Sequence, residues 1–181
     1  CFNKLALAQT AAKYPLTITS GSYSSISATG VIQPDLLIND SSVNIVNLSP
    51  GFQINGIIYS KLIMHSNGYL ILYNGTFQQP GAYYDANILN SSNIIIGPFI
   101  ADLGISSIAT SAAYTQTIGN EHIFEWKNFS RLNNGDDILN FQVRLNYLTG
   151  QIKFVYGQCE QGTGTIGPNV VWKTTGTTWS S

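Results

Sequence analysis

The sequence predicts an all-β protein, an antiparallel sandwich of two sheets, and three observations support this. First, apolar and polar residues alternate without a break over 138–147, which is typical of a strand with one buried and one solvent-facing side. Second, similar short runs recur along the chain between Gly, Asn and Pro turns, which suggests roughly ten to twelve strands. Third, no amphipathic helix pattern of useful length occurs. A jelly-roll topology or a barrel fits the same pattern.

Composition indicates an extracellular protein without a nucleic-acid partner. The chain has 181 residues, which fits one domain, and its 44% hydrophobic residues can fill a two-layer core. The 8 basic and 9 acidic residues are scattered, so no basic surface for nucleic acid or anionic lipid is expected. Solubility must come from uncharged polar side chains, as is common in secreted β-proteins.

The first residues resemble a targeting segment rather than part of a fold. Ala6-Leu7-Ala8 matches the small-x-small pattern of a signal-peptidase site. Residues 1–8 are therefore interpreted as a signal-peptide remnant, and residues 9–181 as a single β-sandwich domain. Alternatively, Cys1 is the acylated first residue of a lipoprotein. Both interpretations take the protein across a membrane, and no later run is apolar for long enough to predict membrane insertion.

The pairing of the two cysteines stays open. If Cys1 is removed, Cys159 stands alone, and an odd cysteine in a secreted protein suggests a partner outside these residues. A Cys1–Cys159 disulfide is the alternative. The two cysteines do not have the spacing of a metal site.

Short strands and turns are expected at the start of the domain. Residues 14–18 and 23–26 predict a hairpin or a bent edge strand. Residues 30–42 are rich in turn-forming residues and predict a loop. Residues 43–54 predict a strand pair interrupted at Ser49-Pro50-Gly51.

A clear hairpin follows. Residues 57–66 lead out, Asn67-Gly68 turns, and residues 69–73 return. Asn-Gly suits a type I′ turn, because both central positions of that turn need positive φ. Residues 93–103 are almost wholly apolar, which predicts a strand in the centre of a sheet followed by a turn at Gly97-Pro98.

The second half of the chain predicts a meander of adjacent antiparallel strands. Residues 112–118 pair with 123–127 across Gly119-Asn120. Residues 138–147 and 152–156 then form a further hairpin. Consecutive hairpins of this kind build one sheet.

Four phrases of the sequence carry a family resemblance. In order, they are MHSNGYLIL, IIIGPFIADL, HIFEWKNFSR and LNFQVRLNYLTGQIKFVYG. With these separations, residues 14–172 resemble the N-terminal β-sandwich domain of large secreted proteins of Bacteroidota, which commonly carry a C-terminal type IX secretion sorting signal. The resemblance implies a secreted or surface-displayed accessory module, part of a longer protein with further domains, and it implies no reaction.

The resemblance also implies structural roles for its motif residues. Asn67 and Gly68 make a turn, Trp126 and Phe141 fill the core, and Asp102 hydrogen-bonds a neighbouring loop. These roles belong to the scaffold, so a binding site is expected in the loops instead.

The predicted ligand-binding segment is residues 76–92, the longest segment without the apolar–polar periodicity of a strand or helix. Tyr83, Tyr84 and Asp85 lie within it, and Tyr73 lies just before it. Aromatic rings stack on sugar faces and a carboxylate accepts hydrogen bonds from hydroxyl groups, so this set suits a glycan. The alternative is that the tyrosines cover one end of the sandwich.

No convergent catalytic groups are found. His65 and His122 lack the spacing of a zinc site. Glu125 is an acid within a strand, but glycoside hydrolysis needs a second carboxylate across the substrate. A surface ion pair of Glu125 with Lys127 or Arg144 is therefore expected. The chain is predicted not to be an enzyme, with a glycoside hydrolase as the weakest alternative.

One Asx-rich turn offers oxygen ligands. Asn133, Asp136 and Asp137 could hold calcium, but the downstream glutamate of a twelve-residue calcium loop is lacking. Asn and Asp are common in turns because their side chains form hydrogen bonds with the nearby backbone. No cofactor is therefore expected, and calcium stays a weak alternative.

Two functions fit the sequence. The favoured one is a non-catalytic extracellular or cell-surface module that mediates adhesion or glycan binding through its end loops, with a surface glycan or a protein as ligand. The other is an architectural spacer that precedes a catalytic or repeat region.

Overall fold

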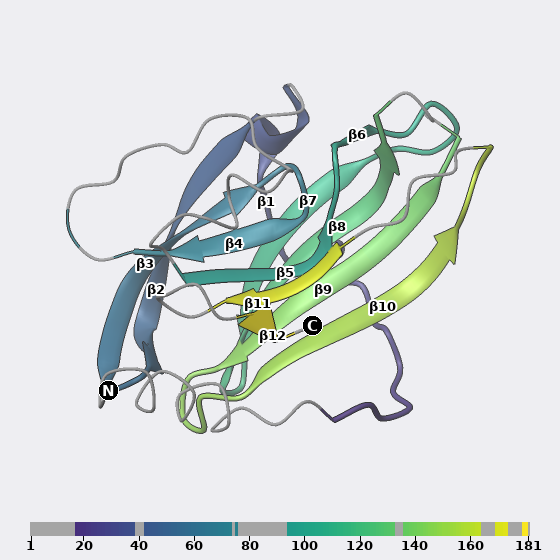
Figure 1. Ribbon diagram of the computed structural model, residues 1–181. Coiled ribbons are helices and arrows are strands. Elements are labelled where there is room, and N and C mark those ends of the chain that lie inside the picture. Colours follow the sequence, from purple (N-terminus) through teal and green to yellow (C-terminus); the bar gives the residue numbers. More distant parts are fainter. Residues whose placement is uncertain are drawn as a thin grey trace.

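The computed structural model describes residues 17–38, 42–73, 75, 94–132, 136–163, 169–173 and 179–180, the last two ranges by their backbone alone. Two six-stranded antiparallel sheets pack together (Figure 1). The predicted all-β sandwich is therefore confirmed. In this part of the chain the helical structure is a 3-10 helix of four residues, η1 (Pro34–Leu37).

The first sheet contains the predicted meander. Its order is β1-β7-β8-β9-β10, and β6 pairs with the end of β8. Strands β7 to β10 follow one another in sequence and in space, as the alternating pattern predicts. The bounds are β1 Val31–Ile32, β6 Leu103–Ile105, β7 Ala112–Ile118, β8 Glu121–Arg131, β9 Ile138–Asn146 and β10 Ile152–Glu160.

The second sheet has the order β12-β11-β5-β4-β3-β2. Strand β5 lies between β4 and β11, which confirms the central position expected from its apolar sequence. The chain crosses to the first sheet between β5 and β6. The bounds are β2 Val43–Ile54, β3 Ile57–His65, β4 Tyr69–Leu72, β5 Ile94–Ile100, β11 Asn169–Lys173 and β12 Trp179–Ser180.

Trp126 is at the centre of the core between the sheets. It is fully buried, and its ring stacks on Phe141 with centroids 5.1 Å apart. The register places these two residues opposite each other on β8 and β9, so they share the inner face. Trp126 Nε1 donates a hydrogen bond of 2.9 Å to the main-chain oxygen of His65 in the second sheet. The expected core roles of Trp126 and Phe141 are therefore confirmed.

The second sheet is apolar on both faces. On its outer face, Ile45, Ile63, Ile71 and Ile95 lie opposite one another on four adjacent strands. Ile45 at the edge is 50% exposed, while the other three are at most 1% exposed. Strands with two apolar faces read as continuous apolar runs, which explains why β4 and β5 show no alternation.

The N-terminal expectations were wrong in detail. Residues 17–26, which include most of the predicted hairpin, form no strand, and residues 14–16 lie outside the described ranges. Instead, β1 and η1 occur within the predicted loop 30–42. Strand β1 has two residues and pairs with β7, so a local pattern could not reveal it.

Residues 43–54 form one strand rather than the predicted pair. The register of β2 against β3 shifts between Asn47 and Phe52, which marks a bulge around a cis Ser49–Pro50 peptide bond. Residues in a bulge are not paired with the neighbouring strand. Proline, which lacks an N–H, therefore fits at this position without loss of a hydrogen bond between strands.

The predicted hairpin 57–73 is confirmed, but the predicted type I′ turn is wrong. His65 and Tyr69 are paired, so the loop has three residues, and Gly68 N donates to His65 O at 3.2 Å. Gly68 has φ 78°, whereas Asn67 is not among the residues with positive φ. This is the pattern of a three-residue loop with glycine in the left-handed region, rather than a type I′ turn. A Cβ on Gly68 would lie 2.0 Å from Phe99 O.

Gly97-Pro98 does not form a turn, since β5 continues through it to Ile100. A Cβ at Gly97 would lie 2.4 Å from Ile100 Cγ1, so the glycine permits close packing rather than a change of direction. Pro98 accepts a hydrogen bond of 2.6 Å from the hydroxyl of Tyr156.

Candidate functional site

The polar residues of the first sheet's outer face are covered by the chain itself. Residues 17–30, here called the N-terminal strap, precede β1, and the stretch 23–29 contacts this face. Tyr23 lies against β10, where a Cβ on Gly157 would be 2.8 Å from the tyrosine ring. Ile26 is 4% exposed, although it belongs to a segment without regular structure. The strap is therefore packed onto the sheet.

Glu125 on β8 is the main anchor of the strap. It is fully buried, and its carboxylate accepts hydrogen bonds from the hydroxyl of Tyr23 and, at 3.0 Å, from the main-chain N–H of Ile26. Gln142 Nε2 donates a third bond of 3.3 Å. The expected surface ion pair of Glu125 was therefore wrong. Alternation correctly places Glu125 on the outer face, but it cannot reveal that a distant segment covers that face.

Neighbouring residues extend this buried polar layer. Gln142 Nε2 also donates to Ser24 O at 2.8 Å, and Lys127 Nζ donates to Ser27 Oγ at 2.8 Å. Burial, and then the hydrogen bond to Glu125, raises the pKa of Tyr23. The hydroxyl therefore stays protonated and can donate.

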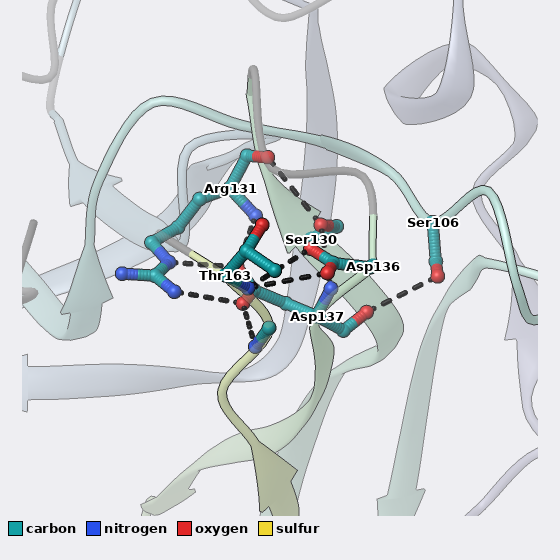
Figure 2. Close-up of polar contacts among 7 residues, drawn as sticks. Ser106, Ser130, Arg131, Asp136, Asp137 and Thr163 are labelled. Carbon is teal, nitrogen blue, oxygen red and sulfur yellow. Dashed lines mark hydrogen bonds and ion pairs between the residues drawn. The ribbon is translucent and has the colours of Figure 1, made fainter. Parts of the chain in front are cut away.

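A second polar cluster lies at the end of β8. Arg131 and Asp137 form a buried ion pair in which Nε donates to Oδ2 and Nη2 to Oδ1, each at 2.7 Å (Figure 2). Asp137 Oδ2 also accepts from the Arg131 main-chain N–H at 3.0 Å. Oδ1 accepts from Gly162 N at 2.6 Å. This bidentate geometry is strong and directional.

The pair joins three separate segments at one end of the sandwich. Ser106 Oγ, between β6 and β7, donates to Asp137 O at 3.1 Å, and Asp136 accepts from Thr163 N at 3.1 Å (Figure 2). The loops after β6, β8 and β10 are therefore held together. Burial would raise the pKa of Asp137, but the hydrogen bonds from Arg131 and Gly162 outweigh it, so the pKa lies below its usual value.

The calcium candidates lie in this cluster. Both oxygens of the Asp137 carboxylate accept hydrogen bonds from protein donors, and Asp136 is bonded to Thr163 N. Asn133 lies outside the described residues. Within the described ranges, no three His, Cys, Asp or Glu side chains gather where they could hold a metal ion.

The predicted glycan site is described only at Tyr73. Tyr73 follows β4 and is partly buried against the outer-face cluster of Ile63, Ile71 and Tyr69. Tyr83, Tyr84 and Asp85 lie outside the described residues. The segment that carries them connects β4 to β5, which are paired neighbours with Leu72 opposite Ile94.

The two histidines are both buried but have different partners. His65 Nδ1 accepts a hydrogen bond of 3.1 Å from Asn67 N, and its ring stacks on Tyr69 with centroids 4.4 Å apart. Burial lowers the pKa of His65 to about 3. His122 instead lies between Thr117 Oγ1, 2.8 Å from Nδ1, and Pro50 O, 2.7 Å from Nε2.

Asn67 has a further role that the resemblance did not specify. Its Oδ1 accepts from Leu103 N at 2.9 Å, so the β3–β4 turn is attached to the start of β6. The neighbouring Asp102 accepts from Leu132 N through its main-chain oxygen at 2.7 Å. This bond uses the backbone, so a role of the Asp102 side chain in holding a nearby loop stays a prediction.

Cys159 lies in β10, near the end of that strand. It is exposed and has no disulfide partner among the described residues. Cys1 lies outside those residues, so the alternative disulfide stays a prediction. The Sγ of Cys159 lies 3.5 Å from Asn140 O. The residue as a whole is exposed, but its thiol is partly buried, and this burial raises the pKa of the thiol.

Sequence reasoning missed Tyr23 and Arg131 as organising residues. Tyr23 is 102 positions from Glu125, so no local signal could join them. Arg131 and Asp137 are six positions apart, between the strands predicted at 123–127 and 138–147, and their opposite charges were a usable signal.

The fold and these contacts define a β-sandwich domain whose described buried polar groups hold its own loops and strap in place. Comparison with protein-family models matches residues 13–179 to the family described as NIDO related, and the chain belongs to this family of extracellular domains. The protein is therefore an extracellular module. Comparisons with curated proteins and with solved structures gave no match. Among the described residues, no helix is long and apolar enough to cross a membrane.

Proposed function

We propose that this domain is a non-catalytic binding module that contacts glycans through Tyr73, Tyr83, Tyr84 and Asp85. The observation that carries the proposal is the position of Tyr73. It is partly exposed directly after β4, shortly before the segment 76–92. Partly exposed aromatic rings next to a long connection on a rigid sheet are suited to stacking against sugar rings.

The state of two described acids, Glu125 and Asp137, supports a non-catalytic role. Glu125 and Asp137 are fully buried, and each accepts several hydrogen bonds from protein donors. A general acid or base must reach the proton that it transfers. Glycoside hydrolysis, the weakest alternative, predicts activity that Glu125→Gln removes, and we expect none.

The binding proposal is tested on a glycan array and by pull-down with cell-wall polysaccharide. We expect Tyr83→Ala and Tyr84→Ala each to weaken binding about 2- to 13-fold, since a stacked ring contributes roughly 0.5 to 1.5 kcal/mol. Tyr83→Phe and Tyr84→Phe are the matched controls, because they keep the ring face. Asp85→Asn should weaken binding without abolishing it. Absence of glycan binding, or binding that is indifferent to both alanine variants, would overturn the proposal.

An architectural spacer is the second candidate. The described polar clusters favour it, because the Arg131–Asp137 pair and the strap stabilise the sandwich itself. A gene that continues beyond Ser181 into a catalytic or repeat region would support this role. The sequence resemblance supports the further proposal of surface display in Bacteroidota through a type IX sorting signal.

A further inference from the structure

His65 has partners that are compatible with only one protonation state. The N–H of Asn67 can only donate, so Nδ1 must be unprotonated to accept its bond. The proton of the neutral ring is therefore on Nε2, which is buried and has no hydrogen-bond partner in the part of the chain that the structure describes. An imidazolium at this place would lose the bond to Asn67 and would bury two donors without acceptors.

His122 provides an internal comparison. Its Nε2 lies 2.7 Å from Pro50 O, an acceptor, so Nε2 carries a proton in either state. Its Nδ1 faces the Thr117 hydroxyl, which can donate to a neutral ring or accept from a charged one. Protonation therefore leaves both contacts of His122 in place, whereas it breaks the contact of His65.

The turn that His65 holds connects the two sheets. Asn67 Oδ1 anchors Leu103 N at the start of β6, and His65 O accepts from Trp126 Nε1 on β8. Opening of the turn would break both links. The packed elements present Val43 from β2 and Tyr69 from β4, and burial raises the pKa of Tyr69, so it stays neutral. The crossover attached to this turn carries the acidic residue Asp102. The pKa of His65 is lowered by the burial of its ring.

We propose that His65 is an acid-sensitive latch, and that its protonation opens the β3–β4 turn and releases the contact between β6 and the second sheet. The sign follows from linkage. The pKa of His65 is lowered from 6.5 to about 3, so only the open state binds a proton between these values. The closed turn has its full stability above pH 6.5 and loses it as the pH falls toward 3. The opening equilibrium constant should rise roughly 25-fold between pH 7 and pH 5.

Amide hydrogen exchange with mass spectrometry tests the proposal on the whole chain. The exchange rates measured at pH 7 and pH 5 are each divided by the intrinsic exchange rate of an unprotected amide at that pH. Peptides covering 62–72 and 99–105 are compared with peptides covering 115–124. We expect acid to reduce protection roughly 25-fold in the first two regions and not in the third, a loss that disappears in His65→Gln and persists in His122→Gln.

Two outcomes would overturn the latch. One is an equal pH response of His65→Gln and the wild type. The other is equal acid sensitivity of the His65 and His122 regions in the wild type, which decides the matter even if His65→Gln does not fold.

Discussion

Asp136 and Asp137 are adjacent in sequence but differ in environment. Asp137 is fully buried and bonded to the guanidinium of Arg131, whereas Asp136 is partly exposed and accepts from Thr163 N. A carboxylate that is buried away from water needs its charged partner. Removing either group of a buried ion pair leaves the other as an uncompensated buried charge, which strongly destabilises the fold.

We predict that Asp137→Asn lowers the free energy of unfolding by about 3 to 5 kcal/mol at pH 7. The change leaves the Arg131 charge buried and uncompensated. Asp136→Asn is the matched control and should cost less than about 1 kcal/mol. Urea denaturation of both variants measures the difference.

The same pair predicts a pH dependence. Because the folded-state pKa of Asp137 is lowered, its contribution is complete above the unfolded pKa of about 3.9 and is lost as the pH falls through the folded value. The difference in the free energy of unfolding between the wild type and Asp137→Asn should therefore become smaller below about pH 4. A gap that is constant down to pH 2, or equal losses for both aspartates, would contradict this account.

At the scale of elements, turns show what a local motif leaves undecided. Gly56 and Gly68 have similar φ values of 80° and 78° and both follow asparagine. Gly56 has open space around it, while a Cβ on Gly68 would meet Phe99 O. The same dipeptide therefore serves an exposed hairpin tip in one case and a packed contact between the sheets in the other.

Alanine at each glycine should separate strain from steric overlap. Gly56→Ala is expected to cost about 1 kcal/mol, from the left-handed backbone alone. Gly68→Ala should cost at least about 2 kcal/mol more, because the main chain at Phe99 must move. Thermal or urea unfolding provides the comparison. Equal costs would show that the turn can shift away from Phe99 freely.

The strap is the other element whose role depends on tertiary contacts. In Glu125→Ala, the Tyr23 hydroxyl and the Ile26 N–H lose their acceptor, and the strap should detach from β8. We expect a loss of about 1 to 3 kcal/mol and faster proteolysis within residues 17–30.

Glu121→Ala on the same strand is the control for the strap. Glu121 pairs with Lys153 at 2.7 Å near the surface, so its loss should cost less than about 1 kcal/mol. The strap should then keep its resistance to protease. Equal cleavage of the strap in the two variants would mean that Glu125 does not anchor it.

For the whole molecule, the two sheets differ in the character of their outer faces. The second sheet carries an isoleucine row there, and the first sheet carries a buried polar layer under the strap. Neither sheet fits the simple division into one apolar and one wet face. The described polar residues mostly support the architecture, which is why the binding proposal concerns the connection after β4.

Much of the fold could be predicted because its strands and turns follow from short local sequence patterns. Alternation over 138–147 indicates one strand whatever packs on it, since successive side chains point to opposite faces. The β3–β4 hairpin was also predictable. The register of β1 and the bulge at Pro50 were not, because each depends on a partner strand that is distant in sequence.

For the candidate site, the sequence pointed to residues 76–92 and to one acid on β8. It could not show that Glu125 is buried, because alternation assigns a side chain to a face without saying what lies over that face. The opposite charges of Arg131 and Asp137 were a usable signal for the pair, but the sequence does not show how closely the two side chains approach, and their attraction depends on that distance.

By itself, the sequence determined the all-β class, the meander, the central position of β5 and the extracellular character of the composition. These follow from the two-residue period of a strand and from residue chemistry. Only the tertiary structure decided that the outer polar face is covered, that Asp137 is an ion-pair partner, and that His65 and His122 differ in their tolerance of a proton. The physical reason is that burial and hydrogen-bond partners come from segments that are far apart along the chain.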